Sequence, residues 1–158
     1  MNWQEVCDHP QLRDLSFKIE LNEDGKIIMS PIKVFHSLLQ GEIEALLMKY
    51  LKHGKAFPEC AIATPKGTKV ADVVWASKER LQQIKFEVEC SIAPEICIEV
   101  LSNSNSTKEM LEKKQLYFEQ GAHEFWICDG NGKMRFFNPK MELLHSELVP
   151  DFPSEVEI

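Results

Sequence analysis

Two short segments of the sequence, 69–76 (KVADVVWA) and 94–101 (PEICIEVL), are mostly apolar, yet each holds a carboxylate within its apolar run. Successive side chains of a strand point to opposite faces, so a run that is apolar at both parities predicts a strand covered on both sides. A buried carboxylate without a partner costs several kcal/mol, so Asp72 and Glu99 each require one. The chain must therefore build a sheet with two covered faces and place these two acids inside it.

The rest of the sequence predicts the elements that surround this sheet. Residues 16–31 alternate on either side of the turn Glu23-Asp24-Gly25, which predicts a hairpin. Apolar residues at three-to-four spacing predict helices at 33–51 and 107–120. Further extended segments are expected at 59–63, 69–75, 94–101, 124–128 and 133–137, with one short strand in the last 20 residues.

This element order, ββ-α-βββ-α-ββ, predicts an α/β (α+β) fold in which helices flank a mixed β-sheet. A length of 158 residues fits one domain spanning 1–158, which is large enough to bury a proper core. We see no internal repeat and no low-complexity tract. The helices are therefore expected to pack directly against the sheet.

The cellular setting follows from what the sequence lacks. The first 15 residues carry Asp8, Arg13 and Asp14 and contain no long apolar run, so we expect no signal peptide. No stretch approaches the roughly 20 apolar residues that a membrane span needs. The five cysteines are odd in number and form no C-x-x-C pair, so neither a disulfide framework nor a zinc site is expected. We expect a cytoplasmic protein.

The net charge is −7 and the pI is near 5.3, values that argue against a protein dedicated to coating nucleic acid. The charge is uneven, however: residues 64–86 hold five cations against two acids. This segment could form a local basic surface on an acidic protein, or it could be an ordinary solvated face. Taken alone, the segment favours the second interpretation.

Asp72 and Glu99 gain a chemical interpretation when they are considered together. Adjacent strands lie roughly 4.8 Å apart, so carboxylates on the same face of two consecutive strands can share one divalent cation. Oxygen ligands with remaining positions for water suit Mg²⁺ or Mn²⁺. The alternative is that each acid meets a lysine or backbone donors, and for either residue alone that alternative is favoured. Two such acids on consecutive strands favour the metal site.

A lysine from the helix at 107–120 is the third candidate for the site. A lysine next to a metal-bound water and a phosphate can stabilise the attacking hydroxide and the developing negative charge. The apolar face of this helix is predicted to consist of Met110, Leu111, Tyr117 and Phe118. At 100° per residue, Lys114 lies centrally on that face and Lys113 at its edge. The alternative is a lysine that covers apolar surface with its alkyl chain, and for the lysine alone that alternative is favoured.

The segment 98–129 resembles the Uma family of restriction-endonuclease-like proteins in the PD-(D/E)xK nuclease superfamily. Its pattern is E-V-x-S-x-S followed by K-x-x-x-Y-x-x-x-G-[VA]-x-E-[YF]-W-x-x-D. The matching residues are Glu99, Ser102, Ser104, Lys113, Tyr117, Gly121, Glu124, Trp126 and Asp129. Upstream, ELNEDGKIIMSP with His36 resembles the family's opening motif, and ADVVWA its P-D strand, with Ala71 in place of proline. The resemblance covers about residues 16–138.

The resemblance implies a restriction-endonuclease-like core and assigns roles to the candidate residues. Asp72 and Glu99 would be the metal carboxylates, and Lys113 would be the catalytic lysine, because Leu101 occupies the position of the superfamily's usual E-x-K lysine. Glu20 and His36 match the opening motif, so the resemblance implies a further acid and a group that lines the site. The register of the whole motif favours Lys113 over Lys114.

The resulting hypothesis is a Mg²⁺- or Mn²⁺-dependent endonuclease that hydrolyses DNA as a homodimer. A two-fold dimer is expected because cutting both strands of a duplex needs two sites related by symmetry. The hairpin and the aromatics Trp75, Phe136 and Phe137 are the candidate contact surfaces. The alternative, favoured by the acidic charge, is a non-catalytic dimeric scaffold or regulator that retains the nuclease fold.

Overall fold

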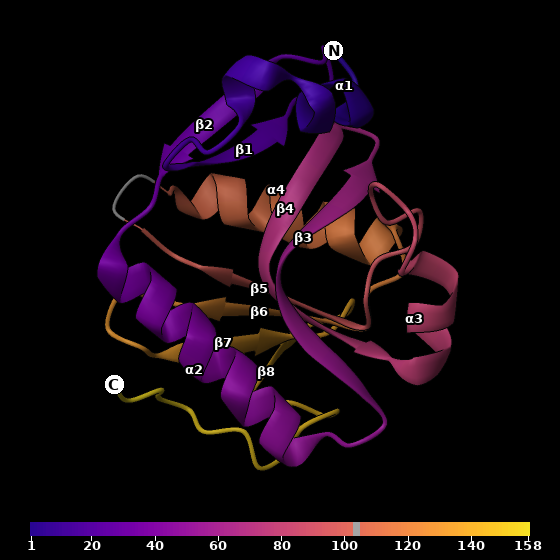
Figure 1. The fold of residues 1–158 in the computed structure, drawn as a ribbon. Coiled ribbons are helices and arrows are strands. Elements are labelled where there is room, and N and C mark those ends of the chain that lie inside the picture. The colour runs from indigo at the N-terminus through magenta and orange to yellow at the C-terminus, as the bar shows by residue number, and fades with distance from the viewer. Residues whose placement is uncertain (103–104) are drawn as a thin grey trace.

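A six-stranded mixed sheet forms the centre of the protein, and a separate two-stranded hairpin packs at one end of it (Figure 1). The computed structural model describes residues 1–102 and 105–158. The elements, in chain order, are α1 Trp3–Asp8, the 3-10 helix η1 Pro10–Leu12, β1 Phe17–Leu21, β2 Ile27–Pro31, α2 Val34–Tyr50, β3 Gly54–Thr64, β4 Gly67–Ser77, α3 Lys78–Ile84, β5 Ile96–Val100, α4 Thr107–Glu119, β6 Glu124–Cys128, β7 Met134–Phe137 and β8 Glu142–Leu143.

The large sheet has the strand order β3-β4-β5-β6-β7-β8. The pair β5–β6 is parallel, and the other four pairs are antiparallel. Parallel neighbours need a crossover connection, and α4 supplies it between β5 and β6. The predicted α/β fold with a mixed sheet flanked by helices is confirmed.

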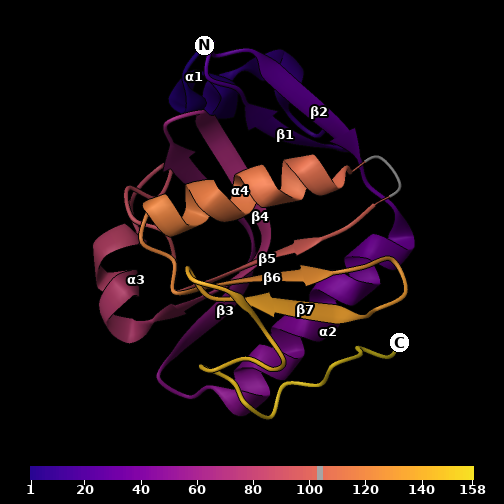
Figure 2. The ribbon, with the colours of Figure 1, turned by 180° about the vertical axis from the view of Figure 1, so that it is seen from behind.

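The two long helices cover opposite faces of the sheet, as the front and rear views show (Figures 1 and 2). On one face, α2 buries Leu39, Ile43 and Leu47 against β5 and β6, where Ile98 and Trp126 are fully buried. On the other face, α4 buries residues such as Met110 and Tyr117 against the opposite sides of the same strands. Two separate cores thus explain why β4 and β5 are apolar at both parities.

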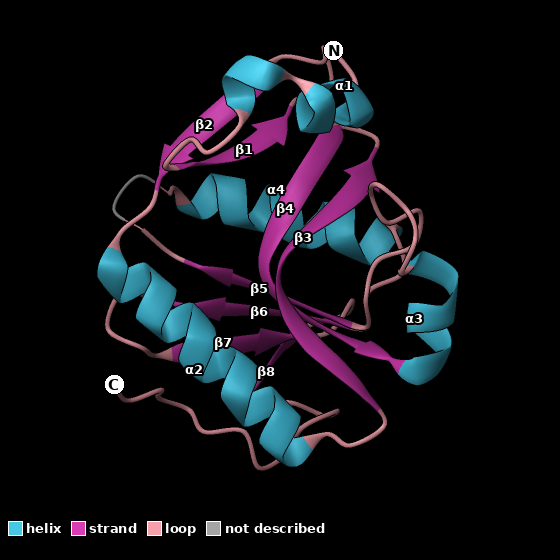
Figure 3. Cartoon of the chain, viewed as in Figure 1, coloured by secondary structure: helices cyan, strands magenta, loops and turns pink. Residues whose placement is uncertain are grey.

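Two short helices, α1 and α3, were not predicted from the sequence (Figure 3). Each is too short for a repeating apolar stripe, and each begins at a side-chain cap instead. Asn2 and Glu5 form a reciprocal capping box at α1. Ser77 caps α3 by accepting a hydrogen bond from the Arg80 backbone N–H. In the part of the chain that the structure describes, no helix is long and apolar enough to cross a membrane.

The aromatic residues expected on a contact surface lie in the cores instead. Phe136 and Phe137 are 2% and 4% exposed, so that part of the prediction was wrong. Trp75 packs partly buried against the core under α2. Phe136 is buried because the C-terminal segment covers its face of the sheet, and the ring centroids of Phe136 and Phe152 lie 6.2 Å apart. Phe137 points to the other face and belongs to the core under α4.

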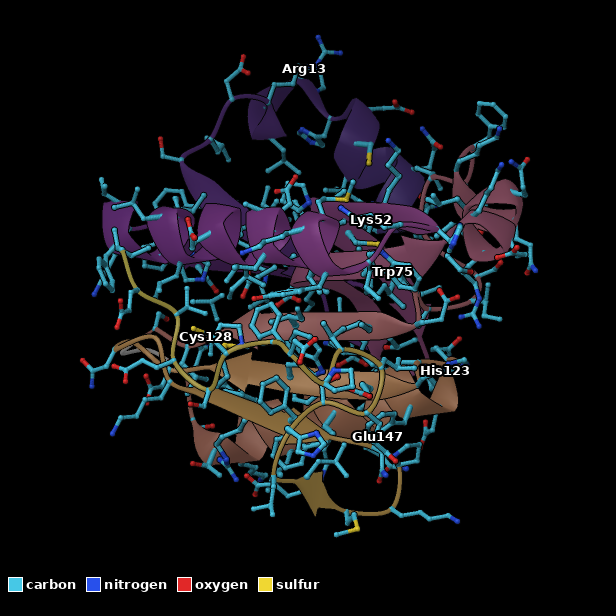
Figure 4. The ribbon with its side chains drawn as sticks, turned by 90° about the horizontal axis from the view of Figure 1, so that it is seen from below. Arg13, Lys52, Trp75, His123, Cys128 and Glu147 are labelled. Carbon is cyan, nitrogen blue, oxygen red and sulfur yellow. The ribbon has the colours of Figure 1, made fainter. Side chains whose placement is uncertain are left out.

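One buried carboxylate, that of Glu124 on β6, binds residues 146–148 at the start of the C-terminal segment. Glu124 is 1% exposed and accepts hydrogen bonds from Trp126 Nε1 at 2.8 Å and Ser146 Oγ at 2.6 Å. It also accepts from the backbone N–H groups of Glu147 at 3.0 Å and Leu148 at 2.8 Å. In the view from below, the loop that carries Glu147 passes in front of the strands of the sheet (Figure 4). Glu124 therefore acts as a structural staple.

Replacing Glu124 with leucine is expected to destabilise the protein by about 3 kcal/mol, because several buried donors lose their acceptor at once. Urea unfolding followed by circular dichroism measures the change. The matched control is Glu142→Gln on β8, which removes an exposed ion pair with Arg135 and should cost less than about 1 kcal/mol. Equal losses in the two variants would show that Glu124 is not the staple.

Candidate active site

Asp72 lies where β4 lacks regular backbone pairing with both of its neighbours. The β4–β5 ladder ends at the pair Val73↔Ile98. One step further in the same register, Asp72 stands opposite Glu99, beyond the last backbone pair. On the other side, Glu59 of β3 stands opposite Asp72, and its φ of 53° interrupts the β3–β4 ladder. The sheet therefore opens around Asp72 and leaves room for side chains.

Side chains replace the missing backbone bonds at this opening. Gln40 of α2 donates through Nε2 to the Asp72 carbonyl and to Glu59 Oε1, both at 2.6 Å. The Asp72 carboxylate accepts the Val100 backbone N–H through Oδ2 at 2.8 Å. Because both its backbone and its carboxylate are bonded, Asp72 is held in one orientation.

The β1–β2 hairpin contributes two charged residues from the same face of β1, Lys18 and Glu20. Glu20 Oε2 accepts the Val70 backbone N–H at 2.7 Å and so ties the hairpin to β4. Lys18 Nζ lies 3.0 Å from Asp72 Oδ1 and 3.4 Å from Glu99 Oε2. One oxygen of each predicted metal carboxylate thus converges on a single cationic atom.

Glu99 uses its other oxygen for two residues of α4. Tyr117 donates its hydroxyl to Glu99 Oε1 at 2.8 Å, and Lys113 Nζ lies 3.2 Å from the same oxygen. Lys113 Nζ also lies 2.9 Å from Glu20 Oε2. The residues that the sequence singled out as Asp72, Glu99, Lys113 and Glu20 therefore form one contiguous charged cluster.

The orientation of α4 differs from the one that periodicity alone predicted. Leu111 is 46% exposed, whereas Met110, Leu116 and Tyr117 are buried. Lys113 lies within the arc that these three residues define, since Leu116 and Tyr117 flank it at roughly 60° and 40° around the helix axis. Lys114, which periodicity placed at the centre, instead has its Nζ 4.9 Å from the centroid of the Phe137 ring.

His36, the first-turn histidine of α2, also reaches the cluster. Its Nε2 lies 3.1 Å from the Val100 carbonyl and 3.5 Å from Asp72 Oδ2. The hydrogen bond with Asp72 raises the pKa of His36 above its ordinary value, against the opposing effect of burial. Within the described residues, His36 Nδ1 is buried and has no hydrogen-bond partner.

Burial and the two lysines set the charge states of the acids. Burial pushes the pKa of Asp72 upward, but Lys18 and then His36 outweigh it and hold that pKa well below its usual range. Glu99 is the opposite case, because burial prevails over Lys113 and Lys18 and raises its pKa to about 7. The pKa of Lys18 itself is raised, because the surrounding carboxylates outweigh burial.

The cluster borders a cavity of about 40 Å³, enough for a water molecule or a small ion. Its lining includes Lys18, His36, Asp72, Glu99 and Lys113. Among the described residues, no group of three or more His, Cys, Asp or Glu side chains has an arrangement that could hold a metal ion. A metal here would therefore have two carboxylate ligands, with water or a phosphate filling the rest, which fits the preferences of Mg²⁺ and Mn²⁺.

The chain matches the model of the Uma2 family, described as "Putative restriction endonuclease", over residues 3–150. It belongs to this family. The resemblance predicted from the sequence is thereby confirmed. Among solved structures, the chain is similar to one described as "a putative nuclease belonging to DUF820" from Anabaena variabilis. The TM-score is 0.69 at 21% identity, over 90% of this chain and 82% of that one. No curated protein matches the chain.

Several other residues of the Uma2 pattern shape the fold around the site. Gly121 follows α4 with a φ of 104°, which favours glycine over other residues. Asp129 closes the β6–β7 turn by accepting the Asn131 N–H at 2.8 Å. Ser102 donates to Asn105 Oδ1 at the start of the loop before α4. Ser104 lies outside the described residues.

Lys18, Gln40 and Glu59 were not anticipated from the sequence. For Gln40 the sequence does hold a signal: a polar residue adjoins Leu39 in the predicted helix, at a position that the structure shows to be buried. Lys18 also left one, because it shares a face of its strand with Glu20. Glu59 left none, because its positive φ is a property of the folded sheet.

The raised pKa of Glu99 predicts how stability depends on pH. An acid whose folded pKa exceeds its unfolded value favours the fold only while protonated, so the contribution is lost as pH rises from about 4.5 to about 7. In EDTA, the free energy of unfolding of Glu99→Gln relative to that of wild type should therefore rise between pH 5 and pH 8, by on the order of 2 kcal/mol. Urea unfolding at both pH values measures this difference.

Wild type and Glu99→Gln both retain His36, so its contribution to the pH dependence of stability cancels in the difference between them. Glu119→Gln, at an exposed position of α4, serves as the control, and its unfolding free energy should depend on pH as that of wild type does. The same pH dependence of stability in Glu99→Gln and in wild type would contradict the raised pKa of Glu99.

Proposed function

We propose that the protein is an endonuclease that hydrolyses DNA phosphodiester bonds with Mg²⁺ or Mn²⁺, using Asp72, Glu99 and Lys113. The observation that carries the proposal is the convergence of Asp72 Oδ1 and Glu99 Oε2 on one cationic atom, with Lys113 Nζ 3.2 Å from Glu99 Oε1. The family to which the chain belongs and the nuclease whose fold it shares both support this class of reaction.

In this proposal each residue of the cluster has a task. A bound divalent cation would polarise the phosphate and lower the pKa of an attacking water. Asp72, fixed by Gln40 and Val100, and Glu99, fixed by Tyr117, supply its carboxylate ligands. Lys113 stabilises the negative charge that develops during the attack.

Two neighbouring residues would keep these groups in position. Glu20 holds the Lys113 ammonium at 2.9 Å, and so aims it at the space beside Glu99. His36 lines the same cavity and orients Asp72 through Oδ2. Neither residue needs to exchange a proton with the substrate for this purpose.

The proposal includes a homodimer, because two active sites related by symmetry can cut both strands of a duplex. With Phe136 and Phe137 buried, the hairpin is the remaining candidate surface, and Phe17, Ile28 and Met29 are exposed on it. Of the cations of residues 64–86, Lys78 and Lys85 are exposed, whereas two others have partners within the chain. Lys66 is paired with Glu112, and Lys69 donates to the Leu21 carbonyl.

A non-catalytic scaffold is the second candidate, and one observation favours it. The buried carboxylates already have cationic partners within the fold, Lys18 and Lys113, as a purely structural cluster would. The two candidates differ in metal binding. A scaffold whose acids serve only these ion pairs would gain no thermal stability from millimolar Mn²⁺.

A supercoiled-plasmid assay tests the proposed reaction. Wild type should convert the plasmid to nicked or linear DNA with Mn²⁺ or Mg²⁺ and should leave it intact in EDTA. Asp72→Asn keeps the size of the side chain but loses the ligand charge, so cleavage should fall by about a hundredfold or more. Cleavage that survives unchanged in Asp72→Asn would identify a contaminating nuclease and remove the support for this site.

The adjacent lysines of α4 provide a matched pair for the catalytic role. Lys113→Ala should lower metal-dependent nicking about a hundredfold, since its charge is held beside Glu99, while Mn²⁺ still raises the melting temperature. Lys114→Ala removes a contact with the Phe137 ring and should change nicking little. Initial nicking rates at equal protein concentration measure both. The reverse order would refute the assignment of Lys113.

A further inference from the structure

Lys18 occupies the position between Asp72 and Glu99 that a shared metal ion would need. Its Nζ lies 3.0 Å from Asp72 Oδ1 and 3.4 Å from Glu99 Oε2. Its side chain is only 13% exposed, and the side chains of both acids are 2% exposed. The contact is therefore a buried ion pair rather than a passing surface contact.

Lys113 does not compete for this position. It contacts Glu99 through Oε1, the oxygen that also accepts the Tyr117 hydroxyl, and its second partner is Glu20. Lys113 thus leaves Glu99 Oε2 and Asp72 Oδ1 to Lys18. The two lysines of the cluster have different partners and can have different roles.

We propose that Lys18 is a resident counter-cation that a divalent metal must displace in order to bind; this rests on the metal site in the proposed function. An ammonium group and a divalent cation cannot lie between the same two oxygens at once. The cavity beside them, about 40 Å³, has room for about one water molecule or ion and none for a second cation and its ligands. Metal binding is then an exchange of cations at the two carboxylates.

The structure also offers Lys18 a place to go. Lys18 also lines a second, larger cavity of about 640 Å³, which α1, β1, α2 and β3 border. Glu44 and Glu59 line that cavity, so a displaced ammonium would find carboxylates there as well as water. The flexible four-carbon stem of a lysine allows this movement without any change in the strand that carries it.

The exchange predicts that Lys18 weakens metal binding. If the arrangement with Lys18 displaced is populated at about one part in ten, the apparent affinity for metal is reduced about tenfold. Lys18→Met should therefore bind Mn²⁺ about tenfold more tightly than wild type in isothermal titration calorimetry. Its melting temperature without metal should fall, because two buried carboxylates lose a counter-charge.

Two control variants separate the exchange from a general effect of charge. Lys113→Met also removes a positive charge from the cluster, but it does not vacate the position between Asp72 and Glu99, so its gain in affinity should be smaller. Lys26→Met, at an exposed position of the hairpin, should bind Mn²⁺ as wild type does. Equal gains for Lys18→Met and Lys113→Met would reduce the effect to net charge and overturn the proposal.

Amine labelling gives a readout that follows Lys18 itself. In wild type, Mn²⁺ should raise the acylation of Lys18 several-fold by mass spectrometry, because the ammonium moves out of its ion pair, while Lys113 labelling stays constant. In Asp72→Asn the labelling of Lys18 should not respond to Mn²⁺.

The outcomes distinguish this inference from the proposed function. If wild type does not bind Mn²⁺ at all, both fail. If wild type binds Mn²⁺ and Asp72→Asn does not, the metal site stands. In that case, weaker binding by Lys18→Met, or labelling of Lys18 that ignores Mn²⁺, would overturn the inference alone.

Discussion

The burial of three carboxylates side by side, two in the large sheet and one on the hairpin next to it, is the constraint on which the rest of the structure depends. Glu20, Asp72 and Glu99 are 8%, 1% and 2% exposed. Isolated ions in such positions would cost several kcal/mol each, so the fold must bring cations and donors to them. It does so from three directions, with Lys18 from the hairpin, Lys113 from α4 and His36 from α2. The peripheral elements are thus tied to the centre by charge as well as by apolar packing.

The opening in the sheet is what makes room for this cluster. A regular ladder on both sides of β4 would bring β3 and β5 to within hydrogen-bonding distance of Asp72 and leave no cavity. The positive φ of Glu59 interrupts the β3–β4 ladder, and the β4–β5 ladder ends at Val73, next to Asp72. A non-glycine residue in that conformation costs of order 1 kcal/mol and persists only where the surroundings compensate it. The two hydrogen bonds of Gln40 provide that compensation.

The sequence predicted those parts of the fold and site that depend on local pattern. The elements of the sheet, the two long helices and the anomaly of two acids in apolar strands are all visible within windows of a few residues. Lys18 was missed because its partners are 54 and 81 residues away, and nothing in its own segment indicates them. The rotation of α4 was misjudged because exposed Leu111 and buried Leu116 are identical in a hydrophobicity pattern. Only the tertiary contacts distinguish them.

The charges of the cluster bear on why two lysines can coexist with a metal site. With the three acids ionised and His36 neutral, Lys18 and Lys113 leave one negative charge uncompensated. With a divalent cation in the position of Lys18 and Lys113 retained, the net charge of the three acids and these two cations is zero. Neutrality matters at this depth, because a net charge in a poorly solvated site is costly. The raised pKa of Glu99, about 7, reflects that cost, since burial and the neighbouring acids both favour its protonated form. A proton on Glu99 and a metal beside it are therefore two ways of meeting the same deficit, and the second way frees Lys18 from the interior while Lys113 remains in place.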